Sequence, residues 1–188
     1  GYGLVIKGAS ENYVTAGGVM NNLLVNNAVS FIRVKGVINL PIYNNTFYLP
    51  STSSITNGIV HITEGEDLGD NSIGTRIKNN VFYGRDGYKH ISVSNDGSTI
   101  AASDVNYNLY WNSAGSVMDY DAGGTTYLSF TAWQDAGYDT SGTSVDPIFQ
   151  NLGTDFALTP LSPAIDAGTN VSLTTDFLGN PIYGTPDI

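Results

Sequence analysis

The sequence predicts an all-β chain folded as a right-handed parallel β-helix, a solenoid closed by a C-terminal capping segment. Three observations lead to this prediction. A short asparagine-containing motif recurs along the chain, and a second motif with strand character recurs between its copies. The composition is that of strands and turns, with 22 glycines, 12 tyrosines and only 13% charged residues. A length of 188 residues with 41% hydrophobic residues is enough for one domain with one core.

The first motif covers residues 19–25, 42–48, 77–83 and 105–111. In each copy a β-branched residue lies three positions before a shared asparagine, and apolar or aromatic residues follow it. An asparagine tolerates the left-handed conformation of a tight turn, and its amide can both donate and accept hydrogen bonds. Stacked copies therefore predict a ladder of Asn22, Asn45, Asn80 and Asn108 inside the coils. The residues expected in the adjoining apolar stack are Leu24, Phe47, Phe82 and Tyr110.

The second motif covers residues 4–8, 32–36, 60–64 and 91–95. Its copies alternate apolar and polar residues, which is the period of a strand with one buried face. A sandwich would join neighbouring strands by hairpins and would not repeat like-facing side chains. A solenoid explains both motifs, because each coil adds one strand to each of several sheets. The residues expected to face inward are Leu4, Ile6, Ile32, Val34, Val60, Ile62, Ile91 and Val93.

The repeats end after Trp111, so we expect the coils to span residues 1–112. Residues 113–188 are expected to hold the last coil material and a cap, within the same domain. A short helix is predicted within residues 128–137, where Ser129 or Thr131 begins it and Gly137 ends it. Such a lid is expected because an open solenoid end exposes apolar side chains and unpaired strand edges.

The C-terminal segment also carries a resemblance. The segments concerned are 133–134, 146–149, 155–158, 162–168 and 176–179, which read WQ, DPIF, DFAL, SPAIDAG and DFLG. They resemble the closing segment of bacterial pectin-lyase-like β-helix proteins, and with the asparagine coils the resemblance covers nearly the whole chain. It implies the C-terminal part of a longer solenoid, an extracellular or cell-surface location, and lyase-like or glycosidase-like ancestry.

Acidic residues in this segment have a simpler structural explanation. An aspartate in a turn accepts hydrogen bonds from nearby backbone amides, which favours turn and cap positions over calcium binding. The residues concerned are Asp146, Asp155, Asp166 and Asp176.

Charge and residue usage exclude several function classes. A net charge of −10 disfavours nucleic acid as a partner. The absence of cysteine excludes disulfides and thiolate chemistry, and the absence of a run of 18 apolar residues argues against a membrane span. His61 and His90 lie on different coils without a paired ligand at metal-binding spacing. Neither a phosphate loop nor a nucleophile elbow is present, and the oligomeric state is not predicted.

A basic face is the first candidate for a binding site. The outward positions of the second motif include Lys7, Arg33, Lys35 and His61, which would stack on one sheet face. In an acidic protein this face favours a carboxylated polysaccharide. If the chain is an enzyme, elimination from a uronate needs a neutralised carboxylate and a base, roles that Arg and Lys can fill. Solvated surface lysines are the competing interpretation.

An acidic loop follows the third copy of this motif. It contains the carboxylates of Glu64, Glu66, Asp67 and Asp70 within seven residues. Calcium takes six to eight oxygen ligands from such loops, so calcium is the predicted cofactor here. The spacing does not match an EF-hand, and an exposed acidic loop without metal is the alternative.

Three alternatives remain open at this stage. A glycoside hydrolase needs two carboxylates about 5 to 10 Å apart, and the pairs Glu64 with Asp67 or Asp119 with Asp121 are the candidates. A non-enzymatic module would use the solenoid as a cell-surface or adhesive rod. Aromatic residues at strand ends would stack on sugar rings or pack beneath loops. Those residues are Tyr48, Tyr83 and Trp111.

Overall fold

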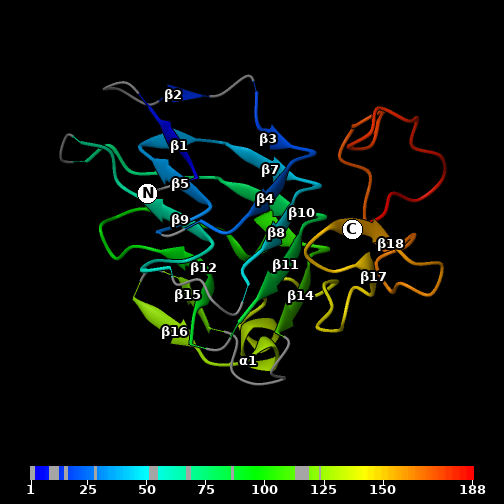
Figure 1. Ribbon diagram of the computed structural model, residues 1–188. Coiled ribbons are helices and arrows are strands. Elements are labelled where there is room, and N and C mark those ends of the chain that lie inside the picture. The colour runs from blue at the N-terminus through cyan, green and yellow to red at the C-terminus, as the bar shows by residue number, and fades with distance from the viewer. Residues whose placement is uncertain are drawn as a thin grey trace.

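A computed structural model describes residues 3–8, 13–14, 17–27, 29–50, 55–66, 69–85, 87–112, 119–122 and 124–188, with the backbone alone for residues 13–14 and 119–121. The predicted parallel β-helix is confirmed. The described residues form three stacked parallel sheets with little helix, and the coils follow one another from the blue to the green part of the chain (Figure 1). No helix among them is long and apolar enough to cross a membrane.

The first sheet contains the second sequence motif. Its strands pair in parallel and without offset from β1 to β9, so Leu4, Ile32 and Val60 align in one inward row. The predicted inward residues of the inner coils are 0–1% exposed, whereas Leu4 on the edge strand is 39% exposed. The strands in spatial order are β1 (Leu4–Lys7), β5 (Ile32–Lys35), β9 (Val60–Thr63), β12 (Lys89–Val93), β15 (Asp119–Ala122) and the antiparallel β16 (Thr125–Tyr127).

The second and third sheets contain the two halves of the asparagine motif. The second sheet consists of β3 (Val19–Met20), β7 (Pro41–Tyr43), β10 (Arg76–Lys78) and β13 (Val105–Asn106). The third sheet consists of β4 (Leu23–Val25), β8 (Thr46–Tyr48), β11 (Val81–Gly84) and β14 (Leu109–Asn112). Between the sheets lie the paired strands β2 (Tyr13–Val14) and β6 (Val37–Ile38) and the 3₁₀ turn η1 (Ala102–Asp104).

The asparagine ladder lies at the corner between these two sheets. Each side-chain amide donates to the Oδ1 of the next asparagine, over 2.9 Å from Asn22 to Asn45, 3.0 Å from Asn45 to Asn80 and 2.9 Å from Asn80 to Asn108. Each backbone N–H donates to the same oxygen. The amides of Asn45, Asn80 and Asn108 also donate to a carbonyl of the preceding coil. The ladder thus satisfies buried polar groups that would otherwise destabilise the corner.

The left-handed backbone conformation at this corner was expected at the ladder asparagines and is found at other residues. Positive φ angles belong to the residue before each ladder asparagine, not to the ladder asparagine itself. The ladder asparagine follows directly, outside the left-handed region, and its amide donates to the next ladder residue. The left-handed residues are Asn21 (φ 55°), Asn44 (φ 54°), Asn79 (φ 56°) and Tyr107 (φ 58°).

Aromatic stacking fills the core next to the ladder, as predicted. Phe47 and Phe82 stack with ring centroids 4.9 Å apart, and Phe82 and Tyr110 stack at 5.1 Å. All three rings are fully buried, and Leu24 packs against the same cluster. His90 meets both Phe82 and Tyr110 edge-on.

The predicted short helix is α1 (Phe130–Asp135). The Ser129 hydroxyl accepts a hydrogen bond from the Ala132 N–H at the start of the helix, so Ser129 rather than Thr131 is the cap. Gly137 ends it with a φ of 91°. Trp133 is fully buried, belongs to the main core cluster and stacks on Tyr138 at 3.9 Å. The helix therefore contributes to the core.

The segment after the helix lies along the side of the solenoid rather than across its end. The hairpin of β17 (Phe149–Asn151) and β18 (Asp155–Leu158) is followed by a tail that runs back toward the first coils (Figure 1). Asn79 exchanges two hydrogen bonds with Thr169, and the Asn21 amide donates to the Thr175 carbonyl at 2.9 Å. The left-handed asparagines outside the ladder therefore hold the tail.

Candidate functional site

The outer face of the first sheet brings the predicted basic residues into two rows. Backbone pairing places Arg33 beside His61, and His61 beside Ser92. The second row contains Lys7 and Lys35, followed by Thr63. Adjacent strands lie about 4.8 Å apart, so each row presents a side chain at regular intervals along the solenoid axis.

The two lysines of the second row share one carboxylate. The Lys7 ammonium donates a short hydrogen bond to Glu66 Oε1, and Lys35 Nζ lies 3.7 Å from the same oxygen. The hydrogen bond from Lys7 and the charges of both lysines lower the pKa of Glu66 below its usual range. The acidic loop thus compensates the positive charge at this end of the face, in contact with two of the four residues predicted to bind substrate.

The predicted calcium ligands are only partly brought together. The Gly65 N–H donates to the Asp70 carbonyl at 2.7 Å, which closes the loop, while Glu66 contacts the lysines. Asp67 lies outside the described residues. Within the described parts of the chain, no group of three His, Asp or Glu side chains is placed to hold a metal ion. Calcium binding stays a prediction, which a melting curve with calcium or with chelator tests directly.

The two hydrolase pairs stay predictions. Asp67 lies outside the described residues, and only the backbone of Asp119 and Asp121 is described, on strand β15.

Asp96 organises the end of the acidic loop and was not singled out in the sequence. Its carboxylate accepts hydrogen bonds from the Thr63 hydroxyl at 2.7 Å, the Glu64 N–H at 2.9 Å and the Ser98 N–H at 3.0 Å. Partial burial alone would raise the pKa of Asp96, but these hydrogen bonds outweigh it and lower the pKa. The only sequence signal is an Asn-Asp-Gly turn after the strand motif.

A polar pair joins the first row to the second. His61 is 8% exposed, and its Nε2 lies 2.9 Å from the Ser94 hydroxyl, which follows β12 directly. The backbone register pairs His61 with Ser92, and the imidazole contacts Ser94, the next outward-facing residue along that strand. Arg33 occupies the neighbouring position on the other side of His61.

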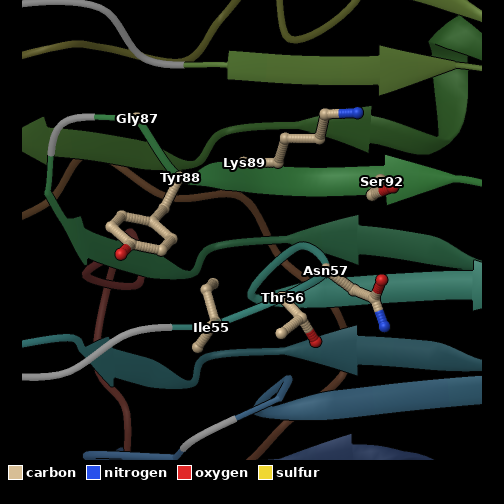
Figure 2. Close-up of a pocket in the computed structure, with 7 residues that line it drawn as sticks. All are labelled: Ile55, Thr56, Asn57, Gly87, Tyr88, Lys89 and Ser92. Atoms are coloured by element: carbon tan, nitrogen blue, oxygen red, sulfur yellow. The ribbon is translucent and has the colours of Figure 1, made fainter.

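A cleft of about 150 Å³ opens at the Ser92 end of this row (Figure 2). In Figure 2, Tyr88 points toward the coil that carries Ile55, Asn57 projects from the turn before β9, and Lys89 extends on the far side of its own strand. The Arg85 guanidinium lies 4.9 Å from the centre of the Tyr88 ring. The lining residues are Ile55, Thr56, Asn57, Gly87, Tyr88, Lys89 and Ser92.

Sequence reasoning missed this cleft. Apart from Ser92, its residues belong to neither repeat, and only the stacking of two coils brings them together. Lys89 was the one available signal, a basic residue just before the fourth copy of the strand motif in an acidic chain.

The aromatic residues on the third sheet do not form an open platform. Phe156 packs on Tyr48 with ring centroids 5.3 Å apart, and Phe149 lies 6.3 Å from Tyr83. Tyr83 is 7% exposed, and Trp111 packs against a buried cluster that includes Ile188. The hairpin and tail cover this row, so packing beneath a loop is the correct interpretation and a sugar platform is wrong.

A second cleft, of about 180 Å³, lies between the tail and the turn at Asn44. It is lined by Asn44, Asp166, Asp176, Pro181, Ile182, Tyr183, Thr185 and Asp187. The carboxylate of Asp176 accepts backbone hydrogen bonds from Leu178 and Asn180, as the turn interpretation predicts, and Asp146 and Asp155 do the same two residues ahead. These acids therefore serve the tail's own turns.

Comparisons with protein-family models, with curated proteins and with solved structures found no match for this chain. The functional argument therefore depends on the outer face of the first sheet and its cleft.

Proposed function

We propose that the outer face of the first sheet, together with the cleft at Lys89, binds an acidic polysaccharide. The chain would then act as a polysaccharide-interacting β-helix module of a secreted or cell-surface carbohydrate-active protein. The resemblance to pectin-lyase-like proteins supports this proposal. The observation that carries it is the continuity between the row of Arg33, His61 and Ser92 and the cleft that Ser92 lines.

The chemistry of the cleft fits a carboxylated sugar. Lys89, whose side chain extends on the far side of its strand, offers an ammonium group at the edge of the cleft for the carboxylate, and Arg85 adds a guanidinium at Tyr88. Thr56 and Asn57 offer a hydroxyl and an amide for sugar hydroxyls. Small numbers of such groups in a concave site fix the orientation of a ligand.

The distribution of charge supports binding at this face. Four of the chain's seven Lys and Arg residues lie on strands of the first sheet, although the whole chain has a net charge of −10. A polyanion is repelled by most of the acidic surface and is attracted where basic residues gather. The four are Lys7, Arg33, Lys35 and Lys89.

Affinity electrophoresis through gels that contain polygalacturonate, alginate or neutral dextran tests the proposal. We expect retardation by at least one acidic polymer, weakened by salt, and none by dextran. Lys89→Ala should reduce the retardation, whereas Lys78→Ala, a matched loss of one charge on the second sheet, should not. Equal effects of the two substitutions, or no retardation by either acidic polymer, would contradict this site. The rod-like adhesive module would then be the better explanation.

A further inference from the structure

The pair formed by Ser94 and His61 has the geometry of a nucleophile and its base. Their side chains are joined by a 2.9 Å hydrogen bond between the serine hydroxyl and Nε2 of the imidazole. Serine is a weak nucleophile unless an adjacent base removes its proton, and the activating distance is about 2.6 to 3.2 Å. The pair lies on the outer face, where Ser94 is partly exposed and His61 is held by its strand.

A cation lies in the same row as His61, on the strand that flanks it on the side away from Ser94. Arg33 is the backbone partner of His61 on the adjoining strand β5, so its side chain leaves the same outward row. Acyl transfer passes through a tetrahedral intermediate with a negative oxygen, and a fixed positive group stabilises that charge. Nucleophile, base and cation thus come from three neighbouring coils in one region.

We propose that Ser94, His61 and Arg33 form a site that hydrolyses esters with short acyl groups. This activity goes beyond polysaccharide binding. Only its natural substrate class, an ester carried by a polysaccharide, rests on the proposed function. A short acyl group fits this site, because the outward positions around the pair carry polar or charged side chains such as Lys35, Thr63 and Ser92. A long acyl chain would need an apolar pocket beside the serine.

Water is the only co-reactant that the reaction needs. The Ser94 oxygen attacks the ester carbonyl carbon, its proton passes to His61 Nε2, and the carbonyl oxygen becomes an oxyanion near Arg33. The oxyanion collapses, the bond to the alcohol breaks, and the alcohol leaves with the proton from His61. Water then attacks the acyl-serine, gives its proton to His61, and releases the acid as Ser94 regains a hydrogen.

Two measurements test this site. The first is hydrolysis of p-nitrophenyl acetate by the full chain, which Ser94→Ala should reduce on the order of 100-fold or to the buffer rate. Ser141→Ala, which removes an exposed hydroxyl outside the first sheet, should leave the rate unchanged. The second is mass spectrometry of the unmodified chain after exposure to a fluorophosphonate, where Ser94 should carry the label. This second measurement does not depend on how a variant folds.

The outcome separates this site from the binding proposal. Ser94→Ala should abolish ester hydrolysis and leave the retardation by acidic polymers unchanged. Hydrolysis no faster than buffer, or a label on serines other than Ser94, would overturn the esterase site and leave polysaccharide binding intact.

Discussion

The Asn108 amide donates to the Asp139 carboxylate over 2.7 Å, so the asparagine ladder ends on an aspartate. Each rung donates toward the C-terminal end of the chain, and the last rung needs an acceptor that has no onward partner. A carboxylate accepts without having to donate, and Asp139 also accepts from the Tyr110 hydroxyl at 2.6 Å. Its φ of 48° lies in the left-handed region that aspartate tolerates.

The first prediction concerns the charge of Asp139. Burial, opposed by hydrogen bonds from Tyr110 and Asn108, raises its pKa to about 6. The folded chain therefore binds a proton that the unfolded chain has released between pH 4 and 6, and the contribution of Asp139 to the free energy of unfolding should fall by about 3 kcal/mol as pH rises through that window. In Asp139→Asn this fall should be absent, because an amide does not titrate. The variant should be less stable than the wild type above pH 6, because the amide has one accepting oxygen where the carboxylate has two. Urea denaturation of both proteins at several pH values measures the difference, and parallel pH profiles would contradict the prediction.

The second prediction concerns His90, whose effect on the pH dependence of the free energy of unfolding is opposite to that of Asp139. Burial lowers its pKa to about 4, so between pH 4 and 6.5 the unfolded chain binds a proton that the folded chain excludes. The free energy of unfolding should rise by about 3 kcal/mol over this window, and His90→Gln should remove the rise. The wild type should therefore vary little with pH, while each single variant reveals the slope of the other group. The control is the double variant, whose free energy of unfolding should not depend on either group between pH 4 and 6.5. If the free energy of unfolding of Asp139→Asn alone did not change with pH, the contribution of His90 would be ruled out.

A third prediction compares two rungs of the ladder. Asn80 is fully buried and accepts from both the backbone and the side chain of Asn45, so Asn80→Ala leaves several polar groups without partners. We expect a loss of about 3 to 5 kcal/mol in the free energy of unfolding. Asn22→Ala at the exposed first rung removes the same atoms and should cost under about 1 kcal/mol. Equal losses in urea denaturation would show that the ladder does not derive its stability from burial.

A fourth prediction concerns the carboxylate shared by the two lysines. Glu66→Gln removes the charge that compensates Lys7 and Lys35, so the affinity for an acidic polysaccharide should increase and depend more steeply on salt. Stability should hardly change, because exposed ion pairs contribute little. Asp135→Asn, which neutralises an exposed acid at the end of α1, is the matched control for net charge. An equal gain in both variants would mean that overall charge, not the local face, controls binding.

Most of the fold could be predicted from the repeats in the sequence, because stacking places similar side chains at the same position in every coil. The ladder, the aromatic stack and the inward rows of the first sheet followed from like residues alone. The role of Asp139 was not predicted, because this residue belongs to no repeated motif and reaches the ladder from a turn after the helix. The cleft was not predicted for a related reason, since Asn57 and Lys89 line one cleft only when their two coils are stacked. The sequence predicted the outward lysines, but it did not predict that Glu66 forms ion pairs with Lys7 and Lys35. Spacing along the chain does not show where a loop folds back.

The tail held by Asn21 has a consequence for the order of folding. Coil-to-coil contacts such as Asn22 with Asn45 join residues 23 positions apart, whereas Asn21 and Thr175 are 154 positions apart. Closing a long loop costs more conformational entropy, and contacts of high sequence separation form late. The coils can therefore form from neighbour to neighbour while the tail docks last. In hydrogen exchange, the amides of the tail should open before those of the ladder.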